Sequence, residues 1–168
     1  MGGELDIVEI HELERHEVKD FFKTHWGSDE MVISSGIFTC SELDGFLTRD
    51  RSGDINGLIT YVIRQETCEM ISLDSVMEGK GIGSALLHAV ENRARNQGCS
   101  IIKLVTTNDN MRALSFYQKR EYRLSRIIKD AVTEARKQKP EIPLIGYHGI
   151  PLFDEIELVK ELGGNETK

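Results

Sequence analysis

The chain has 168 residues, of which 39% are hydrophobic and 29% charged, and its formal net charge is -7 at pH 7. This length suits one domain, and the acidic balance argues against nucleic acid as the main partner, because phosphate binding needs clustered Lys and Arg. No apolar run approaches the roughly 20 residues of a membrane-spanning helix, and the first residues lack the regions of a signal peptide. We therefore expect a cytoplasmic protein without a membrane partner.

Cysteine and histidine residues give no pattern of metal ligands. Cys40, Cys68 and Cys99 are widely spaced and form no CxxC pair, and the five histidines are scattered. This usage is typical of buried thiols in a reducing compartment. We expect neither a disulfide framework nor metal catalysis.

The first half of the chain predicts strands around one helix. Residues 5–10 alternate like a strand, and residues 13–27 carry apolar side chains at helical spacing before a terminal glycine. Residues 44–65 predict a hairpin, because two β-branched and aromatic runs flank an Arg-Ser-Gly-Asp turn. Residues 67–76 predict a further strand.

The second half begins with a glycine-rich turn and a helix over residues 81–97, followed by a strand over residues 100–107. A strand, a turn, a helix and a strand within about 40 residues form a βαβ unit, whose strands are parallel. The other predicted elements are a short helix over 110–120, strands over 121–128 and 153–162, and a proline-containing loop over 139–151. The net basic stretch 119–139 is interpreted as a solvated helix face.

This order of elements predicts a mixed α+β fold. The sheet should be twisted and mostly antiparallel, with a central parallel βαβ unit and flanking helices. No internal repeat or linker divides the chain, so we expect one domain over residues 1–168.

The glycine turn, MEGKGIGS at residues 77–84, suggests a phosphate site. A Walker P-loop is rejected because Lys80 is followed by glycine and no earlier glycine is correctly spaced. A GxGxxG fingerprint fails because Ser84 or Leu86 stands where its last glycine is required. The remaining interpretations are a tight connection between strand and helix, or backbone N–H groups that converge on a pyrophosphate at a helix N-terminus. Three glycines in five residues favour the pyrophosphate.

Two segments resemble the GNAT superfamily of N-acetyltransferases. Gly81 and Gly83 match the small positions of its acetyl-CoA signature, Gln/Arg-x-x-Gly-x-Gly/Ala, from which Glu78 departs. A second segment, NDNMRALSFYQKREYR, is similar to the family's Asn-x-x-Ala-x-x-Phe-Tyr-x-Lys pattern. Glu121 replaces the glycine usual before the next strand, so we expect that turn to differ in shape. The positions in step with the second pattern are Asn110, Ala113, Phe116, Tyr117 and Lys119.

The resemblance implies the GNAT, or acyl-CoA N-acyltransferase, fold and direct transfer of an acetyl group from acetyl-CoA, the co-substrate, to an amine in a ternary complex. The alternative is a domain of this fold that binds acyl-CoA as a sensor or scaffold without catalysis. The residues that the resemblance assigns to acetyl-CoA are Ser75, Val76, Met77, Gly79, Lys80, Gly81, Ile82, Gly83, Ser84, Asn110 and Tyr117.

Two side chains are the catalytic candidates. The resemblance makes Tyr117 the acid that protonates the departing sulfur, while its alternative role is that of a core aromatic. The resemblance makes Glu69 the candidate base, since many family members have an acidic residue in this strand that faces the acceptor. By the period of two, Glu69 should share a strand face with Ile71 and Leu73. An ordinary structural charge is the alternative for Glu69, and Asp74 is the second choice as base.

The acceptor is a primary amine, small or on a protein, that the sequence does not identify. We expect acceptor contacts from residues 16–32 and 143–155, where acidic side chains suit a cationic amine. The resemblance allows a homodimer without requiring one. The acidic residues in these segments include Asp29, Glu30, Asp154 and Glu155.

Overall fold

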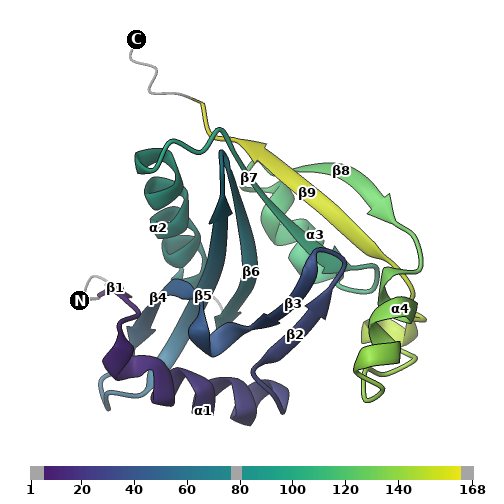
Figure 1. Cartoon of the computed structure of the whole chain (residues 1–168), viewed down its shortest axis with the longest axis horizontal. Coiled ribbons are helices and arrows are strands. Elements are labelled where there is room, and N and C mark those ends of the chain that lie inside the picture. Colours follow the sequence, from purple (N-terminus) through teal and green to yellow (C-terminus); the bar gives the residue numbers. More distant parts are fainter. Residues whose placement is uncertain (1–5, 77–80, 164–168) are drawn as a thin grey trace. The chain divides into compact units, whose positions relative to one another are not determined.

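A computed structural model describes residues 6–76 and 81–163, which form two compact units (Figure 1). The first unit contains the described residues of Met1–Glu30, Thr39–Ile102 and Leu162–Lys168. The second contains Met31–Phe38 and Lys103–Glu161. The single domain expected over residues 1–168 stays a prediction.

The first unit is an antiparallel sheet with the strand order β1-β4-β5-β6, accompanied by two helices. Every element predicted for this part of the sequence is present, and both helices end where the sequence places a glycine, Gly27 and Gly98, in the left-handed region. The elements are strands β1 (Val8–Glu9), β4 (Asp44–Arg49), β5 (Ile55–Arg64) and β6 (Thr67–Ser75), helices α1 (Arg15–Trp26) and α2 (Ile82–Asn96), and the 3-10 turns η1 (Glu12–Glu14) and η2 (Cys40–Glu42).

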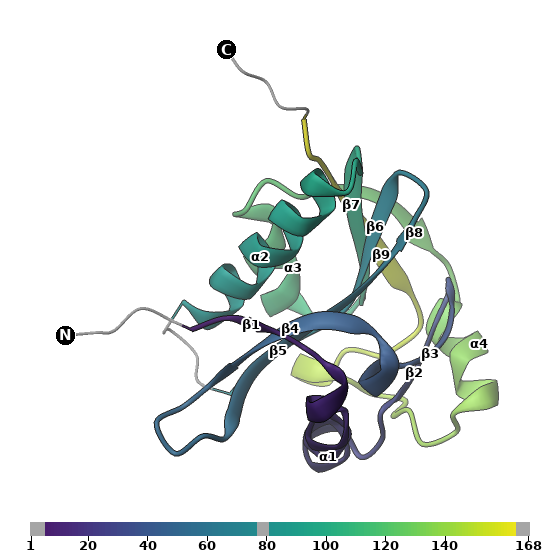
Figure 2. The same ribbon diagram turned by 60° about the vertical axis from the view of Figure 1, so that its left-hand side comes forward.

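Helices α1 and α2 lie on opposite sides of β4 and β5 (Figure 2). On the α2 side, a Cβ added to Gly57 of β5 would come within 2.4 Å of Ile82 and 3.0 Å of Leu86. The absence of a side chain at Gly57 is therefore what allows α2 to approach the sheet. The buried side chains of the two helices are Val18, Phe21 and Phe22 on α1, and Ile82, Leu86, Leu87, Val90, Glu91 and Ala94 on α2.

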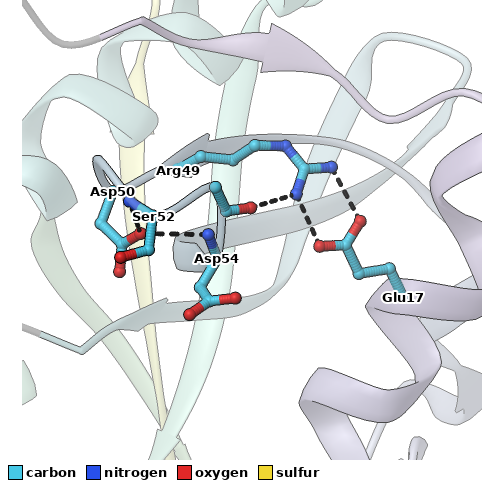
Figure 3. Close-up of polar contacts among 6 residues, drawn as sticks. Glu17, Arg49, Asp50, Ser52 and Asp54 are labelled. Carbon is cyan, nitrogen blue, oxygen red and sulfur yellow. Dashed lines mark hydrogen bonds and ion pairs between the residues drawn. The ribbon is translucent and has the colours of Figure 1, made fainter.

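The β4–β5 turn anchors α1 through one arginine (Figure 3). Arg49 donates two parallel hydrogen bonds to the Glu17 carboxylate of α1, the second at 2.8 Å, and a third to the carbonyl of Gly53 at 2.8 Å. The hydrogen bonds from Arg49 to the carboxylate lower the pKa of Glu17. The Asp50 carboxylate accepts from the N–H groups of Ser52 and Asp54, which closes the turn and fixes the direction of Arg49.

The second unit contains the strand order β7-β9-β8, in which β8 and β9 are antiparallel. Strand β7 begins in the first unit, at Ile101 and Ile102, and continues in the second. The elements are the hairpin β2 (Glu30–Ile33) and β3 (Gly36–Thr39), strands β7 (Ile101–Thr107), β8 (Arg123–Ile128) and β9 (Glu155–Glu161), helices α3 (Met111–Gln118) and α4 (Ala131–Gln138), and the 3-10 turn η3 (Tyr147–Gly149).

The predicted fold class is confirmed: the sheet is mostly antiparallel with a parallel pair, and helices accompany it. The β2–β3 hairpin was not predicted from sequence, and the stretch 119–139, interpreted as a helix face, is helical only in part, because it contains β8 as well as α4. The hairpin strands have four residues each, and α4 buries only the small side chains of Ala131, Val132 and Ala135, so both hydrophobic patterns are short. Within the described ranges, none of the helices has the length and apolar character needed to cross a bilayer.

Candidate active site

Helix α2 begins directly after the glycine turn with an N-terminus suited to an anion. Gly81 is its N-cap, with φ 76°, and offers no side chain to the first amides, while the first turn contains no acidic residue. The N–H groups of Ile82, Gly83 and Ser84 precede the first intrahelical bond, which Ala85 donates to Gly81 at 3.0 Å. Such amides, together with the helix dipole, favour a phosphate group.

The other residues assigned to acetyl-CoA in the first unit lie just before this turn. Ser75 pairs with Gly57 at the end of β6, and the N–H of Val76 donates to the carbonyl of Asn56 at 2.9 Å. The Val76 amide is therefore used by the sheet, whereas its side chain is 51% exposed. Met77, Gly79 and Lys80 lie outside the described residues, as does Glu78.

A β-bulge in β6 changes which side chains share a face with Glu69. Thr60 of β5 pairs with Ser72 but Tyr61 pairs with Met70, so Ile71 is the extra residue. The expectation that Glu69 shares a face with Leu73 is therefore wrong. Val62, Thr60 and Leu58 are two residues apart along β5, so their side chains lie on one face of the sheet. The β6 residues paired with them have their side chains on the same face. These partners are Glu69, Ser72 and Asp74.

This polar face of β6 is buried and lies on the α1 side of the sheet. Glu69 is only 6% exposed, and the hydroxyl groups of Thr60 and Ser72 lie 2.6 Å apart in a buried pair. At the end of the face, the indole N–H of Trp26 on α1 donates to Oδ1 of Asp74 at 2.9 Å. The face therefore carries two carboxylates toward α1 and away from α2.

Burial changes the acidity of the Asp74 carboxyl group. Burial raises the pKa of Asp74 from 3.8 to about 6, against the hydrogen bond from Trp26 and the charge of His25, which both lower it. A carboxyl group with a pKa near neutrality can exchange a proton at physiological pH. Trp26 was not singled out in the sequence, although it lies in the segment 16–32 expected to contact the acceptor.

In the second unit, Asn110 and Tyr117 are held by the two ends of α3. The Asn110 side chain caps the helix and accepts from the N–H of Ala113 at 3.1 Å. Tyr117 is 7% exposed, and its ring contacts those of Phe116 and Tyr122 edge-on, with ring centres 5.0 and 5.6 Å apart.

A Schellman motif ends α3 and fixes the Tyr117 backbone. The N–H of Tyr122 donates to the carbonyl of Tyr117 at 3.1 Å, and that of Glu121 to the carbonyl of Gln118 at 3.1 Å. Glu121 stands at the left-handed position of the motif with φ 76°. The expectation that Glu121 alters this turn is wrong, since the backbone adopts a conformation that glycine favours.

Glu121→Gly should therefore leave the fold intact and raise the free energy of unfolding by up to about 1 kcal/mol. The left-handed conformation costs an L-residue roughly 1–2 kcal/mol, from which the larger entropy of an unfolded glycine subtracts roughly 0.5–1 kcal/mol. Urea denaturation measures the difference. Glu134→Gly, inside α4, is the control and should lower stability by about 1 kcal/mol. If Glu121→Gly were less stable than wild type, the inference that Glu121 is strained in the left-handed conformation would be wrong.

The acidic side chains expected near an acceptor have structural partners in the described chain. Asp29 accepts from the Ser41 hydroxyl at 2.6 Å, Asp154 from the N–H of Asp130 at 2.7 Å, and Glu155 from the N–H of Ser34 at 3.2 Å. Each carboxylate therefore ties down a loop, and this use accounts for its position without an acceptor.

The three cysteines are buried free thiols, and Cys68 and Cys99 are poorly suited to nucleophilic catalysis. Burial raises the pKa of Cys68 to about 12, and it also raises the pKa of Cys99. A thiol must ionise to attack a thioester, so these groups are poor nucleophiles at neutral pH. Among the described residues, no group of three or more His, Cys, Asp or Glu side chains could hold a metal ion.

The fold is similar to those of two solved acetyltransferase structures. One is a Bacillus subtilis acetyltransferase in complex with CoA, with a TM-score of 0.65 and 19% identity over 94% of this chain and 99% of that chain. The other is a GNAT family acetyltransferase from Elizabethkingia anophelis with acetyl-CoA bound, with a TM-score of 0.67 and 19% identity over 95% and 99%. At these identities the likeness concerns the fold.

Sequence comparison gives a second, independent match. YxbD, an uncharacterized protein of Bacillus subtilis (strain 168), is 52% identical over 158 residues, which cover 94% of this chain and 99% of YxbD. The family model described as the Acetyltransferase (GNAT) family matches residues 9–122 and so spans β1 to the end of the α3 motif. The chain therefore belongs to the GNAT family of acetyltransferases.

Proposed function

We propose that the protein is an N-acetyltransferase that moves the acetyl group of acetyl-CoA to a primary amine by direct transfer in a ternary complex. The observation that carries this proposal is the N-terminus of α2, where a glycine N-cap and a first turn without acidic residues suit a pyrophosphate. Family membership supplies the acetyl donor, and the solved relatives with bound CoA and acetyl-CoA support it.

The chemistry assigns roles to two side chains, a base and an acid. Glu69 accepts a proton from the acceptor ammonium, directly or through a water molecule, so that the free nitrogen lone pair attacks the thioester carbonyl carbon. The tetrahedral intermediate collapses as the carbon–sulfur bond breaks, and Tyr117 donates its phenolic proton to the departing thiolate. The attacking nitrogen loses its second proton as the amide forms, and this proton restores the Tyr117 phenol through solvent. The products are an N-acetyl amide and CoA thiol, and no acetylated protein forms.

We further propose that this reaction takes place in the cytoplasm. The three cysteines are buried free thiols, which fits a reducing compartment.

Thiol release from acetyl-CoA in the presence of a panel of small primary amines tests the proposed activity. We expect steady release with at least one amine, and a reduction of about 10²-fold in kcat for Tyr117→Phe. This is the lower end of the range for general acid catalysis, because a thiol with a pKa of roughly 8.5 leaves readily without a proton. Ser52→Ala is the control, since it also removes one hydroxyl group and Ser52 is exposed in the β4–β5 turn, outside the segments expected to contact the acceptor.

The two alternatives give different results in this assay. CoA binding without turnover for every amine would favour a sensor or scaffold that binds acyl-CoA. Turnover that is equal in wild type and Tyr117→Phe would support the enzyme but remove Tyr117 as the acid, leaving it as a core aromatic.

A further inference from the structure

Asp74 has one carboxylate oxygen with a partner and one without. Oδ1 accepts from the indole N–H of Trp26 at 2.9 Å. Oδ2 is buried and, among the side chains of residues 6–76 and 81–163, is the one buried nitrogen or oxygen atom without a hydrogen-bond partner. Buried polar atoms in native proteins rarely lack a partner, so such an atom indicates a strained or ligand-binding position.

The surroundings of this carboxylate favour a cation. The cross-strand neighbour Leu58 and the next residue across, Leu47, are both apolar. His25 on α1 is the titratable group whose charge acts on Asp74, and Glu69 lies farther along the same strand face. Trp26 is 56% exposed, and an indole ring is the aromatic surface that attracts cations most strongly. A carboxylate beside an exposed indole is thus the combination that binds an organic ammonium group.

The position of Asp74 separates it from the candidate base. Glu69 and Asp74 share a face but lie five residues apart on β6, roughly 15 Å along the strand at about 3.3 Å per residue. One amino group cannot contact both carboxylates over such a distance. An ammonium group at Asp74 is therefore a second charge, distinct from the nitrogen that loses its proton to Glu69.

We propose that Asp74 and Trp26 form a subsite for a second, non-reacting cationic group of the acceptor, so that the substrates are amines with two positive charges, such as diamines and polyamines. Oδ2 accepts a hydrogen bond from this ammonium group, and the Trp26 ring contacts its methylene carbons. This inference rests on the proposed function, because it names the acceptor class for that activity.

Kinetics with matched amines test the subsite. We expect wild-type enzyme to use α,ω-diamines of four to ten carbons with a KM roughly 10- to 100-fold below that of alkyl monoamines of equal length, the effect of one charge-assisted hydrogen bond. Asp74→Asn keeps the Trp26 hydrogen bond to Oδ1 but removes the charge, so this preference should disappear with little change in kcat. Asp54→Asn is the control, since its side chain is exposed in the β4–β5 turn, outside the segments expected to contact the acceptor.

Fluorescence gives a readout that needs no catalysis, because Trp26 is the single tryptophan of the chain. We expect its emission to change with a midpoint near pH 6 as Asp74 ionises, and this transition should be absent in Asp74→Asn. Butylammonium should change the emission with saturation at pH 7.5, whereas butanol should not. Bound ammonium should also shift the midpoint to lower pH, because it favours the ionised carboxylate.

Stability distinguishes a binding role from a structural one. The folded pKa of Asp74 lies above its unfolded value, so the native state binds more protons between pH 4 and 6 and loses stability as the pH rises through this window. Asp74→Asn should therefore unfold at a temperature equal to or above that of wild type at pH 7.5. Trp26→Phe is the second variant, and it should weaken diamine binding while the fold remains.

The outcomes separate the subsite from the proposed function. A saturable ammonium response without acetylation of any amine would overturn the proposed function and support the subsite. Acetylation with equal KM for diamines and monoamines, unchanged in Asp74→Asn and without an ammonium response, would overturn the subsite and leave the enzyme. A loss of stability in Asp74→Asn at pH 7.5, with unchanged amine preference, would make Asp74 a structural residue.

Discussion

Gly83→Val is expected to abolish the stabilisation of the fold by CoA. Gly83 contributes its N–H to the first turn of α2, and a β-branched side chain there would separate this backbone from a pyrophosphate. CoA at 100 times its dissociation constant should stabilise wild type by about 2.7 kcal/mol, and the variant should gain nothing. Thermal unfolding with and without CoA measures this difference.

The unliganded variant should remain folded, because valine is no worse than glycine inside a helix. Gly98→Ala provides the matched control at the other end of α2. Gly98 has φ 84°, so this substitution should lower the melting temperature while the shift produced by CoA persists. A normal CoA shift in Gly83→Val would show that the pyrophosphate binds elsewhere and that the glycines only connect β6 to α2.

Much of the fold could be predicted because local patterns determine it. The apolar stripe of α2, the glycines at its two ends and the β-branched strands on each side are all visible within residues 67–107. The Asn110 cap is likewise a local interaction with a residue three positions along the chain. Such features depend on neighbours in sequence, so a single sequence contains the information that specifies them.

The features that escaped prediction depend on distant residues. The bulge at Ile71 is defined only by the pairing of β6 with β5, and it moves Leu73 off the face of Glu69. The contact between Trp26 and Asp74 joins residues 48 positions apart. For the same reason a period of two, applied to β6 alone, wrongly placed Leu73 beside the candidate base and concealed the alignment of Glu69 with Asp74.

The shared face of Glu69 and Asp74 makes the two carboxylates a matched pair for testing the base. Glu69→Gln keeps the size and most hydrogen bonds of the side chain but removes its ability to accept a proton. General base catalysis contributes ~10²–10⁴-fold, so kcat should fall by about that factor, while the KM for acetyl-CoA barely changes. Asp74→Asn should lower kcat much less, since its expected effect is on the KM for the acceptor.

The pH dependence of kcat in Glu69→Gln shows whether the variant has lost a general base or a structural charge. As the pH rises, more of the acceptor arrives already deprotonated, so the deficit of Glu69→Gln should shrink if the carboxylate is the base. A structural charge would behave differently: the variant would lose thermal stability, as expected for a side chain only 6% exposed, and its surviving activity would keep the wild-type pH profile. Full activity of Glu69→Gln at every pH would remove Glu69 from the chemistry. The proton would then pass to water or to Asp74, and a large fall of kcat in Asp74→Asn would decide between these two.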